Sequence, residues 1–147
     1  MTTRPETDRR EWTAVFPPRP ASVGLARLYV RRRLTLWRWE GDIEDAVLVA
    51  SELLANAVRY GRLPARTVLL RLALDDDALL IDVSDPVPAF PNFVATPPAP
   101  HADAGRGLAI VRTLATDLTW FLRDPTGKTV RATLRPGGVA GAARRNL

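Results

Sequence analysis

The strongest constraint on the fold is a change of periodicity in the middle of the chain, where a helical pattern gives way to two strand patterns. Apolar residues recur at helical spacing over residues 43–57, with Asp42 placed to cap the helix and Gly61 placed to end it. Residues 67–74 and 78–85 instead repeat apolar side chains at every second position. Three aspartates separate these two runs. The pattern therefore predicts a helix followed by an antiparallel hairpin.

The flanking segments extend this pattern at both ends. They predict an edge strand at 11–16, a first helix from Ser22 to about Trp39, a third helix beginning around Gly107, and two final strands at 118–123 and 128–134. Helices combined with mostly antiparallel strands form layered α+β domains. We therefore expect a two-layer α+β sandwich, with about five strands and three helices on one face of the sheet.

Length and composition favour one globular domain. The chain has 147 residues, 46% of them hydrophobic, and it contains no cysteine. It has no run of about 18 apolar residues and no apolar segment at its N-terminus. We expect a cytoplasmic protein with a flexible N-terminus at 1–10, a domain at 11–135 and a disordered tail at 136–147.

One candidate site is a polar stripe on the second predicted helix. At about 100° per residue, Glu52, Asn56 and Arg59 lie on one side of this helix, opposite its apolar face. A carboxylate, an amide and a guanidinium in this arrangement suit a nucleophile, a magnesium ion and a phosphate. The same stripe is also typical of a solvated helix face, and the sequence of this segment alone favours that alternative.

A second candidate is Asp85, at the end of a predicted strand. Alternation places Asp85 on the face of Leu79, Ile81 and Val83, which meets the helices. A buried carboxylate needs a partner, and the exocyclic amine of a purine would supply one. Alternatively, the strand ends early and Asp85 starts a turn.

A third candidate follows a proline-rich segment at 86–100, which predicts a long loop. There Gly105, Arg106, Gly107 and Leu108 open the third predicted helix. Glycines allow close approach to phosphate oxygens, and a helix N-terminus directs N–H groups at them.

A different glycine, Gly127, precedes Lys128 and Thr129 and suggests a phosphate-binding P-loop. The glycine that this motif requires five residues earlier is Leu122, and strands surround the segment on both sides. We therefore reject a P-loop.

The order of these features resembles the histidine-kinase-like ATPase superfamily, which includes gyrase, the heat-shock chaperone ATPase domain and MutL. The resemblance runs from about Trp12 to Leu134 and implies the Bergerat ATP-binding fold. The motifs at 51–61, Ser-Glu-Leu-Leu-Ala-Asn-Ala-Val-Arg-Tyr-Gly, and at 105–111, Gly-Arg-Gly-Leu-Ala-Ile-Val, look like those of anti-sigma-factor serine/threonine kinases.

The resemblance implies ATP and Mg²⁺ as cofactors and assigns roles on the second helix. Asn56 matches the position that holds magnesium, and Glu52 matches the general base or orienter of the substrate hydroxyl. Arg59 lies where relatives often carry a basic residue near phosphate. The implied activity is phosphoryl transfer to a serine or threonine of an antagonist protein, together with sequestration of a sigma factor.

Elsewhere the resemblance assigns nucleotide contacts. Asp85 matches the adenine-reading aspartate, and the segment from Gly105 to Leu108 matches the second glycine box along the triphosphate. Thr129 matches a residue that supports the adenine contact, although alternation directs it away from the core. Relatives often dimerise, which favours a homodimer.

Two departures favour an alternative function. The first glycine box of the family reads Asp-x-Gly-x-Gly, but here Pro-Val-Pro-Ala-Phe-Pro follows Asp85 and removes both glycines. Tyr60 stands where many relatives have histidine. The alternative is a non-catalytic regulator that binds ATP or a sigma factor without phosphoryl transfer.

The net charge of +5 raises the question of nucleic-acid or membrane binding through the arginine-rich segment from Arg19 to Arg38. Few aromatic residues interleave with these arginines. We therefore favour a solvated or partner-facing helix, and no nucleic-acid or membrane partner.

Overall fold

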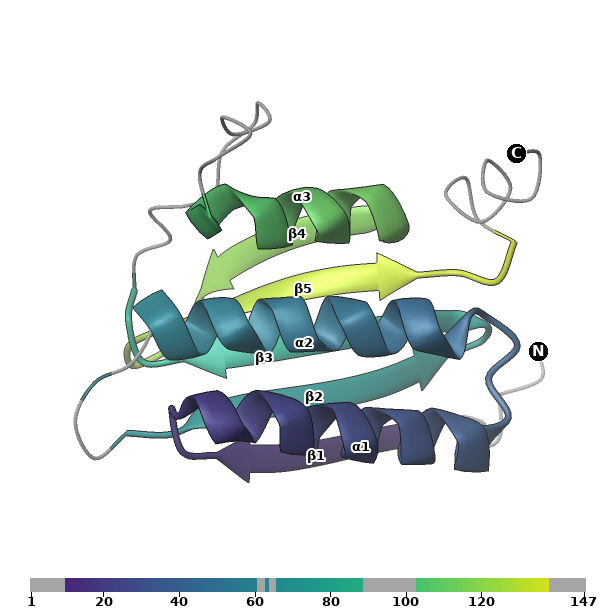
Figure 1. The fold of residues 1–147 in the computed structure, drawn as a ribbon, viewed down its shortest axis with the longest axis horizontal. Coiled ribbons are helices and arrows are strands. Elements are labelled where there is room, and N and C mark those ends of the chain that lie inside the picture. Colours follow the sequence, from purple (N-terminus) through teal and green to yellow (C-terminus); the bar gives the residue numbers. More distant parts are fainter. Residues whose placement is uncertain (1–9, 61–62, 64–65, 89–102, 138–147) are drawn as a thin grey trace.

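The structure of the chain is a computed structural model that describes residues 10–60, 63, 66–88 and 103–137. Its elements are β1 (Arg10–Phe16), α1 (Pro20–Trp37), α2 (Ile43–Tyr60), β2 (Val68–Asp75), β3 (Ala78–Asp85), α3 (Asp103–Leu114), β4 (Asp117–Leu122) and β5 (Lys128–Leu134). They form a two-layer α+β sandwich with the three helices on one face of a five-stranded sheet, so the predicted fold class is confirmed (Figure 1).

The sheet is antiparallel at every pairing between its strands. Its order is β1-β2-β3-β5-β4, so β3 lies in the centre between β2 and β5. In the register of the β3–β5 pair, Val83 lies opposite Val130 and Asp85 lies opposite Lys128. The last residue of β3 therefore meets the first residue of β5.

Period-two alternation directs one apolar side of the sheet at the helices. The residues that fill this layer without solvent exposure include Val30 and Leu34 of α1, Val49 and Leu54 of α2, and Leu70, Leu72, Leu79 and Ile81 of the sheet. Burial of this apolar surface is the main force that holds α1 and α2 on the sheet.

The C-terminal end of α1 differs from the prediction. The apolar pattern predicts a helix to about Trp39, but α1 ends at Trp37 because Arg38 adopts a left-handed conformation with φ 53°. The Trp39 N–H then donates to the Leu34 carbonyl at 3.2 Å, as in a Schellman motif. Trp39 is buried, and its indole N–H donates to the Asp77 carbonyl at 2.9 Å. Periodicity cannot separate this reversed turn from one more turn of helix.

The predicted start of α2 agrees with the structure. The Asp42 carboxylate accepts a hydrogen bond from the Asp45 N–H at 3.0 Å, which is the geometry of an N-cap. Two acidic residues, Glu44 and Asp45, stand in the first turn, where the helix dipole favours them. Gly61, which we expected to end the helix, lies outside the described residues.

The predicted start of α3 is wrong. This helix begins at Asp103 rather than around Gly107, so Gly105 and Gly107 lie within its first turns. Glycine inside a helix lowers its stability by about 1 kcal/mol relative to alanine. For this reason the sequence pattern predicts a helix that begins only around the second glycine. Leu108 and Val111 are buried in the core and hold α3 against the other elements.

The opposite face of the sheet carries a chain of ion pairs across its strands. Arg71 of β2 lies 2.7 Å from Glu11 of β1 and 3.3 Å from Asp82 of β3. Asp82 also accepts hydrogen bonds from Arg131 of β5 at 2.8 and 2.9 Å. Charged side chains thus cover the face that has no helix layer.

Part of the arginine-rich segment makes contacts within the fold. Arg31 of α1 forms a two-bond pair with Glu44 of α2 at 2.7 and 2.9 Å, and the Arg33 guanidinium lies 5.8 Å from the centre of the Trp12 ring. Within the described ranges, no helix has the length and apolar character needed to cross a membrane. The N-terminal residues 1–9 and the tail from 138 lie outside those ranges.

Replacement of a core leucine in α1 tests the helix layer. Leu34 has no solvent exposure, and we expect Leu34→Ala to lower the free energy of unfolding by about 2–5 kcal/mol. The matched control is Leu36→Ala, because Leu36 is 62% exposed and its loss should change stability by less than about 0.5 kcal/mol. Urea unfolding curves of both variants measure the difference, and equal losses would contradict this packing.

Candidate functional site

Four element ends meet at one end of the domain. β3 finishes beside the start of β5, and the C-terminal end of α2 and the first turn of α3 lie at the same end, on the left of Figure 1. This follows from the antiparallel order, because β3 runs toward this edge and β5 runs away from it. The three segments that sequence analysis selected therefore come to one region of the molecule.

The polar stripe of α2 lies beside the apolar face of the helix, which packs in the core. Leu53, Leu54 and Ala57 are buried, whereas Glu52 and Asn56 are half-buried and Arg59 is exposed. The core contacts fix the rotation of the helix about its axis. That rotation keeps the carboxylate and the amide at the boundary of the core.

Asp85 is buried at the end of β3, on the same face as Val83. This agrees with the placement that alternation predicts. Its Oδ1 atom also accepts the Val87 N–H at 2.8 Å, so the residue starts a turn as well. The strand does not end early, because β3 extends to Asp85, and the turn begins directly after it.

The partner of this carboxylate within the chain is Lys128, the first residue of β5. Lys128 Nζ lies 2.9 Å from Asp85 Oδ2 and 3.0 Å from Oδ1, and it donates to the Val87 carbonyl at 3.1 Å. Both side chains are buried. Burial raises the pKa of the Asp85 carboxyl above its ordinary value, while the hydrogen bonds from Lys128 and from the Val87 N–H act in the opposite direction.

Lys128 is not among the predicted site residues, although the sequence carries a signal for it. Val130, Ala132 and Leu134 alternate on the core face of β5, and the same alternation places Lys128 on that face. A lysine on a core face requires a buried partner. We instead expected the amine of a ligand to meet Asp85.

Thr129 lies on the other face of the sheet. Its hydroxyl is 2.8 Å from the hydroxyl of Ser84, and both residues are buried. This agrees with the direction that alternation predicts. The contact places Thr129 next to the residue before Asp85, behind the face that carries the carboxylate.

Only the backbone is described for part of the predicted glycine box. Gly105, Arg106 and Gly107 belong to α3, but their surroundings lie outside the described part of the chain. Leu108 is described and is buried in the core. The predicted loop is described only to residue 88, so residues 89–102 also lie outside.

A cavity of about 310 Å³ opens beside the end of β3. Ser84, Asp85 and Pro86 line it together with Arg66, and with Arg123 and Thr126 of the β4–β5 turn. Its described wall does not include Glu52 or Asn56.

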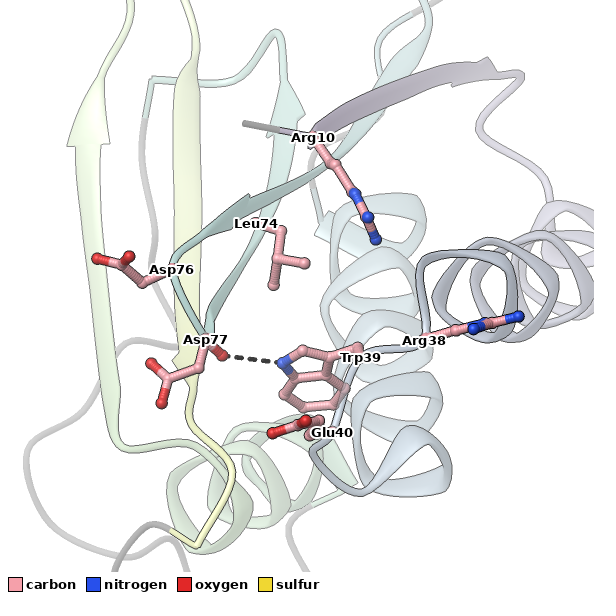
Figure 2. A pocket seen from close by; sticks show the side chains of 7 residues that line it. All are labelled: Arg10, Arg38, Trp39, Glu40, Leu74, Asp76 and Asp77. Carbon is pink, nitrogen blue, oxygen red and sulfur yellow. Dashed lines mark hydrogen bonds between the residues drawn. The ribbon is translucent and has the colours of Figure 1, made fainter. Parts of the chain in front are cut away.

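A larger cavity of about 630 Å³ lies at the opposite end of the domain (Figure 2). Figure 2 shows the Trp39 indole in this cavity, with its N–H directed at the Asp77 carbonyl. Glu40, Asp76 and Asp77 place three carboxylates in its wall. Arg10 and Arg38 also line this cavity, so its wall carries charges of both signs, and its described lining includes none of the predicted site residues.

The donor groups at the β3 end suit a magnesium nucleotide in part. Magnesium prefers oxygen ligands and keeps several waters, so one amide oxygen together with phosphate oxygens is a sufficient protein contribution. Asn56 is the matching amide. Within the described residues, no three His, Cys, Asp or Glu side chains cluster as a metal site. Asp85 is buried at this end, and Lys128 already pairs with its charge.

Comparison with known proteins agrees with this architecture. A sequence model described as "Histidine kinase-like ATPase domain" matches residues 16–134. Among curated proteins, no sequence gives a significant match.

Two solved structures share the fold. The RsbU and RsbW domains of a Mycobacterium tuberculosis protein superpose with a TM-score of 0.63 at 20% identity, over 86% of this chain and 32% of that one. The histidine kinase domain of a blue-light-activated kinase from Erythrobacter litoralis superposes with a TM-score of 0.51 at 20% identity, over 67% of this chain and 46% of that one. This chain thus spans less than half of each structure.

Gly127 controls the approach of the β4–β5 turn to Asp85. Its φ is 103°, and an added Cβ would lie 2.3 Å from the Asp85 carbonyl oxygen. We therefore expect Gly127→Ala to lower the free energy of unfolding by up to about 3 kcal/mol. Gly137→Ala is the control, since Gly137 has φ 65° and no atom within 4 Å of an added Cβ. Gly137→Ala should lower the free energy of unfolding by only about 1 kcal/mol. Thermal unfolding of both variants measures this, and a smaller loss at Gly127 than at Gly137 would refute the close approach.

Proposed function

This chain belongs to the family of histidine kinase-like ATPase domains, and on that premise we propose that it binds ATP with Mg²⁺ and acts as an anti-sigma-factor type serine/threonine protein kinase. The observation that carries the proposal is the convergence of the α2 stripe, the end of β3 and the start of α3. These are the three places where the family resemblance assigns metal, base and phosphate contacts.

In this proposal the residues of α2 manage the phosphate end of the nucleotide. Asn56 contributes the protein oxygen ligand to magnesium, which neutralises charge on the phosphates when it is bound. Glu52 accepts the proton of the substrate hydroxyl or orients that hydroxyl, and Arg59 adds positive charge nearby. Catalysis is then mainly positioning and electrostatic stabilisation, as in other phosphoryl transfers.

In this proposal Asp85 meets the base of the nucleotide, and the start of α3 meets its phosphates. The carboxyl of Asp85 accepts a hydrogen bond from the exocyclic amine of adenine, and Thr129 supports that residue through Ser84. The backbone from Gly105 to Leu108 lies along the triphosphate at the start of α3, where the helix dipole favours negative charge. Arg106 adds a cation to that segment.

The proposed partners are proteins. Likeness in fold to a structure that contains an RsbW domain supports a partner of the anti-sigma-factor type. We propose that the chain sequesters a sigma factor, phosphorylates an antagonist protein on serine or threonine, and forms a homodimer.

A second candidate function is a regulator that binds its partner, with or without ATP, and transfers no phosphate. Two observations favour it. Pro86 follows Asp85 where the family has a glycine box, and Lys128 pairs with the carboxylate that should meet adenine. Both features lower nucleotide affinity or turnover, without any effect on a protein-binding surface elsewhere.

Nucleotide binding is tested by heat stability. ATP with magnesium at about 100 times its dissociation constant should stabilise the protein by about 2.7 kcal/mol, which corresponds to several degrees in Tm at this size. Asn56→Ala should abolish this shift because the metal loses its protein ligand. Arg27→Ala, an exposed change on α1, should retain it. Calorimetric scans with and without Mg-ATP provide the measurement, and the same shift in the Asn56 variant would contradict the assigned role.

Phosphoryl transfer is tested by a substitution that removes the negative charge of Glu52 and keeps the shape of the side chain. Glu52→Gln keeps the shape of the side chain but cannot take a proton, so transfer of labelled γ-phosphate to an antagonist should slow by about 10²–10⁴. ATP affinity should stay the same. The control is Glu44→Gln on the same helix, where the carboxylate pairs with Arg31 on the surface. Equal rates in both variants exclude a catalytic role for Glu52, and no transfer by the unmodified protein favours the non-catalytic regulator.

A further inference from the structure

Lys128 is the only lysine in the chain, and it is one of the most buried charged groups that the structure describes. Its side chain is 4% exposed and that of Asp85 is 2% exposed. A lysine ammonium at such burial is stable only with a compensating charge and hydrogen bonds. The pair is therefore built into the end of the sheet and differs from a surface ion pair.

The contacts of the pair use most of the hydrogen-bonding capacity of the Asp85 carboxylate. A carboxylate offers about four lone-pair sites. Oδ1 accepts from Lys128 Nζ and from the Val87 N–H, and Oδ2 lies 2.9 Å from the same Nζ. An exocyclic amine would find the charge compensated and most of the acceptor sites taken.

The ammonium group also contacts the backbone that follows β3. Lys128 Nζ donates to the Val87 carbonyl at 3.1 Å, so one lysine connects the end of β3 to the next residues of the chain. The register of β5 places Lys128 directly opposite Asp85, and Gly127 allows the close backbone approach that this register needs. The geometry of the pair is thus set by the sheet.

We propose that Lys128 is an internal ligand of the base-recognition carboxylate, so that a nucleotide reaches full affinity only when the Lys128–Asp85 pair opens. The ammonium group takes the place that the exocyclic amine of the base would occupy. Lys128 thereby determines how tightly Asp85 can hold the base. This inference rests on the proposed function, because it assumes that Asp85 meets the base.

The inference is tested by removing the charge of Lys128. Lys128→Met keeps a linear apolar side chain, and the freed Asp85 carboxyl can accept an amine through its carbonyl oxygen even when it is protonated. We expect the Kd for Mg-ATP, measured by titration calorimetry, to fall at least tenfold. The matched control is Arg131→Met, which removes an ion-paired cation from the same strand on the opposite face. Its Kd should stay within about twofold of the Kd of the unmodified protein. The tenfold change expected for Lys128→Met corresponds to about 1.4 kcal/mol in binding free energy.

The outcomes separate this inference from the proposed function. If the unmodified protein binds ATP and Lys128→Met binds no more tightly, the inference fails and the proposed function stands. A gain in both methionine variants also overturns it, because the effect is then not specific to the pair. If neither the unmodified protein nor Lys128→Met binds ATP, both are overturned.

A second measurement needs no substitution, so it stands even if Lys128→Met fails to fold. Because Lys128 is the sole lysine, protein labelled with ¹⁵N at the lysine ζ position gives one ammonium resonance in an NMR spectrum. Saturating Mg-ATP should shift this resonance and speed its exchange with water, whereas tripolyphosphate, which has no base, should leave it unchanged. An unchanged resonance at saturation with ATP overturns the inference.

Discussion

The packing of α2 on the sheet is the interaction on which the rest of the structure depends. Its buried residues lie over β2 and β3, and they also contact α1 and α3 on either side. Because a helix presents its faces at fixed angles, burial of Leu53 and Leu54 also determines where Glu52 and Asn56 lie. One apolar contact surface thus supplies both the stability of the domain and the orientation of its candidate site.

On the proposed function, the end of β3 must reconcile stability with ligand recognition. A carboxylate that recognises a base must be buried and accessible to that base, but a buried unpaired charge destabilises the fold. Lys128 resolves the conflict within the chain by pairing with Asp85 across the sheet. A base that meets Asp85 must then compete with a contact that the fold already makes. This is why one interaction bears both on stability and on the proposed affinity for nucleotide.

Patterns of period two and of helical period predict most of the fold because each strand and helix buries one face. The hairpin of β2 and β3 and the N-cap at Asp42 follow directly from such local patterns. The reversal at Arg38 does not, because it depends on the burial of Trp39 in the core, and the early start of α3 does not, because its glycines lower the helix propensity of that segment. In the site, the burial of Asp85 was predictable from alternation. Its pairing with Lys128 links residues 43 positions apart, so it depends on strand register that no local pattern contains.

The residues that follow Asp85 and the side chain of Lys128 act on the same few atoms. Pro86 follows Asp85 and restricts the backbone there, and Lys128 holds the next residue, which stands at the first glycine position of the family's box, through the Val87 carbonyl. A glycine at these positions would permit the backbone to move away from the carboxylate, whereas proline and the lysine contact both oppose such movement. Pro86 and Lys128 therefore restrict the same stretch of backbone, one at the end of β3 and one from β5. On the proposed function, this restriction makes the base end of the site rigid and leaves the phosphate end, on α2 and α3, to supply most of the binding energy.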